Sequence, residues 1–255
     1  MTGAFTFLGT GTSTGVPMIG CECAVCRSAD PKDLRTRSSA WIQSPGVSAL
    51  IDSSTDLRTQ ALRAGMRALD AVFFTHHHAD HVHGIDDLRS FSLFAGKKLP
   101  CYGPAPSLER IREMFAYIFN GKDAPGGGKP LLELVAIEGP VTAGGLTITP
   151  IPARHGDALV FGYRMGNLAY LTDCSSIPPA SFRLLEGLET LILGAMKAPR
   201  HATHFTLEQA LETIELIKPG RAYLTHLNHA VSNAAVSATL PEGVALAWDG
   251  LTLEF

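Results

Sequence analysis

Thr75-His76-His77-His78-Ala79-Asp80-His81 directly follows the apolar run Ala71–Phe74. Such a run indicates a buried strand, and loops at strand ends are places where functional side chains gather. His76 and His78 are two residues apart, so their side chains lie on one side of the chain wherever the backbone is extended. The last two residues of the stretch add an oxygen and a nitrogen, and carboxylate and imidazole are ligands of divalent ions such as Zn²⁺. A histidine-rich surface turn is the alternative, but the regular spacing after an apolar strand favours a metal site.

Short runs rich in Val, Ile, Phe, Tyr and Thr recur along the chain in consecutive blocks. This composition predicts strands, and a doubly wound parallel sheet would alternate strand and helix more regularly. We therefore predict an α/β fold of two mixed sheets packed face to face, with helices outside. No repeat of fixed period and no linker divides the chain, which favours one domain over residues 1–255.

The predicted strands are Ala4–Leu8, Ala40–Gln43, Ala49–Ile51, Ala71–Thr75, Leu131–Ile137, Leu146–Ile151, Val160–Met165, Leu168–Leu171, Thr190–Leu193, Ala222–Leu224, Val244–Trp248 and Leu251–Phe255. The predicted helices are Thr55–Ala64, Ser107–Phe119, Pro179–Glu186, Thr206–Ile217 and Asn233–Leu240. Thr206, with polar residues in the following turn, has the pattern of an N-terminal helix cap.

The composition excludes several classes of protein. Of the 255 residues, 45% are hydrophobic and 18% are charged, which excludes wholesale disorder. The net charge of −3 argues against a strongly basic nucleic-acid-binding protein. No stretch approaches the ~20 apolar residues that a membrane span needs. The first ten residues read as a strand rather than a signal peptide, because they lack a basic segment and a long apolar segment, and we expect a cytoplasmic protein.

Three of the five cysteines crowd into Cys21-Glu-Cys23-Ala-Val-Cys26. In a chain without an export signal, such a cluster favours a metal site over a set of disulfides. His229 is the candidate fourth ligand, and four ligands of this kind would close a tetrahedral structural Zn²⁺ site. Three reduced thiols without a metal are the alternative.

Three later strand-like runs end in a residue that can bind a metal: Thr149–His155, Ala169–Asp173 and Ala222–His226. Together with the histidine-rich stretch, this order of motifs resembles the metallo-β-lactamase superfamily of hydrolases over essentially the whole chain. The resemblance implies an αββα sandwich with a dinuclear metal site. In that site one metal would be held by His76, His78 and His155, the second by Asp80, His81 and His226, and Asp173 would bridge the two. Two such ions can lower the pKa of a shared water and hold both the attacking and the leaving oxygen of a substrate.

The opening segment Leu8–Pro17, followed by the cysteine cluster, narrows this resemblance. Both segments are similar to the phosphoribosyl cyclic phosphodiesterases of the carbon–phosphorus lyase pathway. The resemblance implies two Mn²⁺ or Zn²⁺ ions at the catalytic site, one structural Zn²⁺, and hydrolysis of a small phosphodiester, especially a cyclic sugar one, by a hydroxide held on the two metals. We expect a homodimer, both from this resemblance and because symmetric dimers are the commonest oligomers. We expect the protein to bind neither nucleic acid nor a membrane.

Asp80 and His204 are the predicted catalytic residues. His204 precedes the predicted helix at Thr206, where similar phosphodiesterases carry a histidine that faces the substrate. There it would give a hydrogen bond or a proton to the leaving oxygen, and a surface or capping histidine is the alternative. Arg89 and Arg37 are candidate substrate contacts, because a guanidinium forks onto phosphate oxygens, although an ion pair explains each at least as well.

The sequence also contains two glycine-rich segments and one glycine with consequences for the site. Gly9-Thr-Gly-Thr-Ser-Thr-Gly15 lacks the lysine of a P-loop and the Gly-x-Gly-x-x-Gly spacing, so it reads as a tight turn at the rim of the site. Its backbone N–H groups are candidate phosphate donors. Pro125–Pro130 reads as a surface loop, with a lid over a site as the alternative. Gly194 departs from similar proteins, which often carry an acidic residue there, so an outer support for a metal ligand would be missing.

Functions of other classes stay open. A cofactor-biosynthesis oxidoreductase of the same fold, such as the pyrroloquinoline-quinone pathway member, has a similar cysteine loop. A thioesterase or another hydrolase of the superfamily is a further alternative. The complete dinuclear ligand set favours hydrolysis, and a non-catalytic metal scaffold would not need an open dinuclear centre.

Overall fold

The computed structural model describes residues 3–120, 128–198 and 201–255, and the described strands form two sheets. The first sheet has the order β14-β1-β2-β3-β4-β5-β6 and the second has the order β13-β12-β11-β10-β9-β8-β7. The first sheet consists of β1 (Ala4–Gly9), β2 (Ser39–Ser44), β3 (Val47–Ile51), β4 (Ala71–Phe73), β5 (Leu99–Gly103), β6 (Leu132–Ala136) and β14 (Thr252–Glu254). The second consists of β7 (Val141–Ala143), β8 (Leu146–His155), β9 (Ala158–Met165), β10 (Leu168–Leu171), β11 (Thr190–Gly194), β12 (Arg221–Thr225) and β13 (Val244–Leu246).

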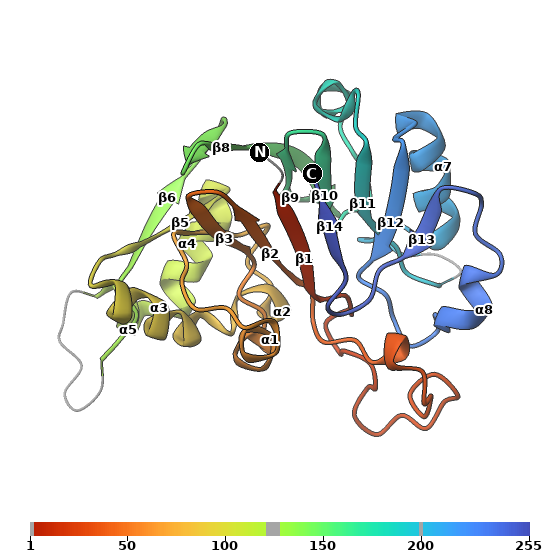
Figure 1. Cartoon of the computed structure of the whole chain (residues 1–255), viewed down its shortest axis with the longest axis horizontal. Coiled ribbons are helices and arrows are strands. Elements are labelled where there is room, and N and C mark those ends of the chain that lie inside the picture. The colour runs from red at the N-terminus through yellow and green to blue at the C-terminus, as the bar shows by residue number, and fades with distance from the viewer. Residues whose placement is uncertain (1–2, 121–127, 199–200) are drawn as a thin grey trace.

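The helices lie on the outer sides of the two sheets. Along the described chain they are α1 (Leu57–Ala64), α2 (Ala79–Val82), α3 (Leu88–Ala95), α4 (Ala105–Met114), α5 (Ala116–Phe119), α6 (Pro179–Phe182), α7 (Leu207–Ile217) and α8 (Asn233–Ser237). Short 3₁₀ turns cover Pro31–Asp33, Ile85–Asp87 and Arg183–Leu185. Helices α1, α3 and α4 gather on one side of the molecule and α7 and α8 on the other, with the N-terminal strand β1 beside the C-terminal strand β14 (Figure 1).

Three hydrophobic clusters account for this layering. One lies between the sheets and includes Phe5, Phe73 and Tyr170. A second packs α1, α3 and α4 against the first sheet, and a third packs α7 against the second sheet. The predicted arrangement of two mixed sheets face to face with helices outside is therefore confirmed. Among the described residues, no helix combines the length and the apolar character that a membrane span requires.

Strand direction brings four strand ends to one edge of the sandwich. In the first sheet β3, β4, β5 and β6 are parallel, and in the second β10, β11, β12 and β13 are parallel. Strand β8 is antiparallel to β9, which is antiparallel to β10, so β8 runs in the same direction as β10. The carboxyl ends of β4, β8, β10 and β12 are the places where the predicted metal ligands begin.

Some elements differ from the sequence prediction. The expected helix Ser107–Phe119 divides into α4 and α5 at Phe115, whose φ of −113° and ψ of 41° leave the helical region. Strands β5 and β7 and helix α3 were not predicted. Strand β5 contains a proline, and α3 begins without a side-chain cap, so neither has a strong local signal. The cap at Thr206 is confirmed, because its side chain accepts from the backbone of Gln209 while the Gln209 side chain accepts from the Thr206 backbone.

Gly9, at the end of β1, allows the next part of the first sheet to pack closely. A Cβ placed there would collide with the carbonyl oxygens of Arg37 and Thr36 and with the amide nitrogen of the Gln60 side chain. We expect Gly9→Ala to lower the free energy of unfolding by about 1–3 kcal/mol, the usual effect of overpacking. Gly139→Ala is the matched control, because a Cβ there meets nothing within 4 Å. Chemical denaturation of both variants checks this, and equal stability of the two would contradict it.

Candidate metal centre

Seven predicted ligands come together where β4, β8, β10 and β12 end. They form two groups whose potential ligand atoms lie within 4.8 Å of one another inside each group. The first group is His76, His78 and His155, and the second is Asp80, His81, Asp173 and His226. All of these residues are buried except His78, which is exposed.

The local backbone explains how one short stretch supplies four of these residues. His78 has φ −65° and ψ 152°, an extended conformation, and it is the N-cap of α2. His76 and His78 therefore project together, as predicted, and their rings are 4.5 Å apart. The single turn of α2 then brings Asp80 and His81 back toward the same point, with Asp80 Oδ2 3.3 Å from His81 Nε2.

Asp173 lies between the two groups. Its Oδ1 is 3.2 Å from His81 Nε2 and 3.1 Å from His226 Nδ1, and its Oδ2 is 3.9 Å from His76 Nε2. One carboxylate therefore faces histidines of both groups with different oxygens. This is the position that a bridging ligand would occupy.

The donor set fits divalent metal ions. The Nε2 atom of His76 is buried and has no hydrogen-bond partner among the described residues, whereas the buried Nε2 of His81 faces two carboxylate oxygens at 3.2 and 3.3 Å. A buried polar atom without a partner is normally destabilising and rare, and a metal ion would satisfy the Nε2 of His76. Histidine nitrogens and carboxylate oxygens are also the ligands that Zn²⁺ and similar ions take.

Outer contacts fix the orientation of the histidines. Asp52 Oδ2 is 2.7 Å from His81 Nδ1, and the same carboxylate accepts from the backbone and the hydroxyl of Thr75, both at 2.8 Å. His155 Nδ1 is 2.6 Å from the carbonyl oxygen of Thr203. These contacts leave the other ring nitrogen free for a metal. The sequence does not single out Asp52, which in the structure directly follows β3, the strand parallel to β4.

The carboxylates make the site attractive to cations. Burial acts to lower the pKa of His81, but Asp173, Asp52 and Asp80 together raise that pKa well above its ordinary value. Burial acts to raise the pKa of Asp173, but His226 and His81 hold it well below its ordinary value. Positive charge is therefore strongly favoured at this point, which supports the fit to metal ions.

His204 lies beside the metal ligands, on the loop before α7. Its ring stacks on that of His226 with centroids 4.9 Å apart, and its Nδ1 is 3.9 Å from Asp173 Oδ2. Burial lowers the pKa of His204 to about 3, so the ring is neutral at neutral pH. A neutral imidazole carries one N–H and can act as a hydrogen-bond donor.

The two candidate phosphate-binding arginines have partners of their own. Arg37 Nη1 lies 3.1 Å from both oxygens of Asp56, and its Nε donates to the Ser13 carbonyl at 2.9 Å. Arg89 Nη1 donates to the carbonyl of Gly128 at 2.8 Å on the exposed surface. This glycine belongs to the predicted loop 125–130, of which residues 125–127 lie outside the described residues. Arg37 therefore makes the ion pair of the alternative interpretation, whereas Arg89 contacts a backbone carbonyl.

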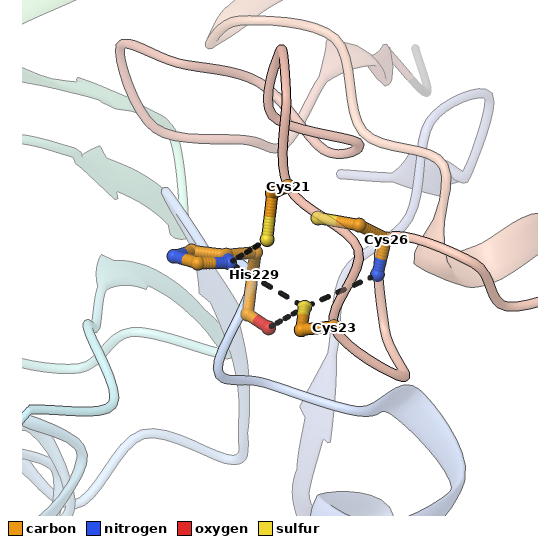
Figure 2. Close-up of side chains that lie close together, drawn as sticks. All are labelled: Cys21, Cys23, Cys26 and His229. Carbon is orange, nitrogen blue, oxygen red and sulfur yellow. Dashed lines mark hydrogen bonds between the residues drawn. The ribbon is translucent and has the colours of Figure 1, made fainter.

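The cysteine cluster forms a second, separate group of ligands. Figure 2 shows Cys21, Cys23 and Cys26 around the ring of His229. His229 Nδ1 is 3.3 Å from Cys21 Sγ and 3.5 Å from Cys23 Sγ, and all four ligand atoms lie within 4.8 Å of one another. The Cys26 amide and the His229 ring lower the pKa of the Cys23 thiol to about 6. Three thiols and one imidazole at this spacing fit a closed tetrahedral zinc site.

The loop after β12 serves both groups. His226 and His229 are three residues apart, and the Leu227 amide between them donates to the Thr10 carbonyl at 2.8 Å. Gly194 faces the adjacent strand. A Cβ there would lie 3.0 Å from the Thr172 carbonyl oxygen, so an acidic side chain would press on the backbone next to Asp173.

Comparison with protein families matches residues 48–227 to the model described as "Beta-lactamase superfamily domain". The chain belongs to the beta-lactamase superfamily. The predicted superfamily and its metallo-β-lactamase fold are confirmed.

Two solved structures are similar to this chain over nearly its full length. A structure described as a new diphosphatase from the PhnP family has a TM-score of 0.92 and 40% identity, covering 99% of this chain and 98% of that one. Zn²⁺-bound PqqB from Methylobacterium extorquens has a TM-score of 0.79 and 22% identity, covering 98% and 99%, which shows the shared fold alone.

Two curated relatives are considerably longer than this chain. A protein named octanoyltransferase from Porphyromonas gingivalis is 39% identical over 96% of this chain and 50% of the relative. A ribonuclease Z from Bradyrhizobium diazoefficiens is 32% identical over 63% of this chain and 48% of the relative. The chain thus spans about half the length of the curated relatives it matches.

Removing one thiol tests the cysteine cluster. We expect Cys21→Ser to lose one tightly held zinc and to lower the melting temperature, because structural zinc contributes directly to folding. Cys101→Ser is the matched control, since that buried thiol lies outside the metal-binding groups of the described residues. Elemental analysis and thermal unfolding of both proteins provide the measurement. A full zinc content and an unchanged melting temperature in Cys21→Ser would show that the cluster holds no structural metal.

Proposed function

We propose that the protein is a metal-dependent phosphodiesterase that hydrolyses a small, anionic phosphodiester, especially a cyclic one on a sugar. The observation that carries the proposal is the place of Asp173 between the two ligand groups. The likeness to a PhnP-family diphosphatase at 40% identity over nearly the full length of both chains supports phosphoester chemistry. The ribonuclease Z relatives support it as well.

The two ligand groups would hold two divalent ions, Mn²⁺ or Zn²⁺. His76, His78 and His155 would bind one, Asp80, His81 and His226 the other, and Asp173 both. When bound, a pair of such ions supplies an activated water and neutralises charge on a phosphoryl group. Asp52 and the Thr203 carbonyl would keep the ligating nitrogens turned toward the ions.

His204 is placed to act on the leaving group. Its ring lies against those of His155 and His226, and 14% of its side chain is exposed. A neutral ring offers a hydrogen bond to a departing alkoxide oxygen and would stabilise the negative charge that develops there. Arg37 and Arg89 would contact the substrate phosphate only after giving up their present partners.

Substrate size and assembly complete the proposal. A cyclic diester keeps its leaving oxygen tethered and needs little remote binding surface. The net charge of −3 does not favour a large polyanion such as RNA. A homodimer and a cytoplasmic location remain part of the proposal. The relative named octanoyltransferase is twice as long as the segment that matches this chain. Its name suggests a second candidate function, in which the substrate is a thioester.

A substrate panel tests the function. The protein loaded with Mn²⁺ or Zn²⁺ is given a ribose 1,2-cyclic phosphate, bis(p-nitrophenyl) phosphate, a phosphomonoester, an RNA oligonucleotide and an octanoyl thioester. We expect both phosphodiesters to be cleaved much faster than the monoester, the RNA or the thioester. Thioester turnover without phosphodiester turnover would overturn the proposal in favour of the second candidate.

His204→Ala tests the leaving-group role. We expect the kcat for the ribose cyclic phosphate to fall about 100-fold or more, the typical effect of removing one hydrogen-bond donor from a developing oxyanion. The loss on bis(p-nitrophenyl) phosphate is expected to be much smaller, because a nitrophenolate delocalises its charge and depends little on such a donor. His201→Ala is the matched control, since its ring lies 4.8 Å from that of His204 but is exposed. Equal losses on the two substrates would remove His204 from this role.

A further inference from the structure

Asp249 is a buried carboxylate that the proposed chemistry does not use. It lies between β13 and β14, and 5% of its side chain is exposed. Its Oδ1 accepts from the backbone and the hydroxyl of Thr10, at 2.9 and 2.8 Å. Its Oδ2 accepts from the backbone and the hydroxyl of Thr36, at 2.9 and 2.6 Å, and lies 3.3 Å from the guanidinium of Arg63. Every partner of this carboxylate is a donor.

The two threonines hold in place the Thr10–Gly11 segment, which contacts the loop after β12. The Gly11 amide donates to the carbonyl of Thr36 at 2.8 Å, and the carbonyl of Thr10 accepts from the Leu227 amide at 2.8 Å. Leu227 directly follows His226. Ser38 joins the same segment, because its hydroxyl donates to the Gly11 carbonyl and lies 3.0 Å from His226 Nδ1. A chain of short contacts therefore runs from Asp249 to the metal ligand.

His226 needs such support. Its φ is 55°, in the left-handed region that residues with a Cβ rarely adopt. A residue held in that region keeps its conformation only where its surroundings impose it. The surroundings here are Thr10, Gly11 and Ser38, and the first of these is fixed on both its backbone and its side chain by Asp249.

We propose that Asp249 is a positioning residue for the metal centre that contains His226. By clamping Thr10 to Thr36, it holds Leu227 and thereby the imidazole of His226 in the place that a metal ion requires. The inference rests on the proposed dinuclear site. It assigns a role to a residue near the C-terminal end of the chain, about 20 residues beyond the last predicted ligand.

Asp249→Asn is the first variant of the test. The substitution keeps the shape of the side chain but turns one acceptor into an amide donor, which would face the donors of Thr10 or Thr36. Titration with Mn²⁺ and electron paramagnetic resonance of the loaded protein are the measurements. In the unaltered protein we expect two ions close enough to show spin coupling. In Asp249→Asn we expect one of them to bind about 10- to 100-fold more weakly, with loss of the coupling, while zinc at the cysteine cluster is retained.

Asp33→Asn is the matched control. Asp33 is also a buried carboxylate, and it binds Arg35 at 2.9 Å and the Asn233 amide at 2.8 Å without touching Thr10 or Thr36. A purely structural role of Asp249 predicts that both variants lose stability and keep both Mn²⁺ ions coupled, and that result would overturn the inference. Thr36→Val is a milder second variant, which removes the 2.6 Å bond and should weaken the same ion to a smaller degree. Failure of the unaltered protein to bind two coupled ions would overturn the proposed dinuclear site together with this inference.

Discussion

The buried negative charge around His81 is the constraint on which the candidate metal centre depends. Asp52, Asp80 and Asp173 place oxygens 2.7, 3.3 and 3.2 Å from the two ring nitrogens of this fully buried histidine. Carboxylates in a dry interior are unfavourable unless a positive charge compensates them. A proton on the His81 ring or a metal ion at its Nε2 would supply that charge, one in place of the other. The fold therefore holds an excess of ligands together in a place where only a cation makes their burial favourable.

The parallel direction of the strands brings these ligands together with few residues. Because β4, β8, β10 and β12 end at one edge, one or a few residues after each strand are enough to supply all the ligands. The stretch after β4 supplies four of these ligands, and the loop after β12 serves both groups, since it carries His226 to the other predicted ligands and His229 to the cysteine cluster. A zinc ion held at the cluster would thus also restrain the loop that carries a ligand of the other centre.

Residue type and spacing explain what the sequence could predict. Histidines and cysteines are rare enough that a regular spacing after an apolar run identifies them as candidate ligands. The members of each predicted ligand group, and those of the cysteine cluster, do lie together within their own group. Asp52 and Asp249 carry no such signal, because an aspartate near a turn is common and only the three-dimensional partners reveal its role. Strand β5 and helix α3 were missed for a related reason. Tertiary packing of Leu99 and Leu88 stabilises these segments, whereas their local patterns are weak.

Backbone strain gives an independent reason to place function at this edge. Among the described residues other than glycine, those with positive φ are Asp52, Lys218 and His226. Lys218 ends α7 in the left-handed conformation that commonly closes a helix. Asp52 and His226 have no such local reason. His226 is a predicted metal ligand, and Asp52 contacts another predicted ligand, His81. Left-handed backbone at residues with a Cβ is unfavourable and persists where surrounding contacts over-determine it. The hydrogen bonds of Thr75 to Asp52, and of Thr10 to Leu227, are those contacts. The protein thus uses stable sheet edges to hold His81 and His226 in positions that the chain alone would not adopt, and this is the arrangement expected of a preorganised site rather than of a core assembled for stability alone.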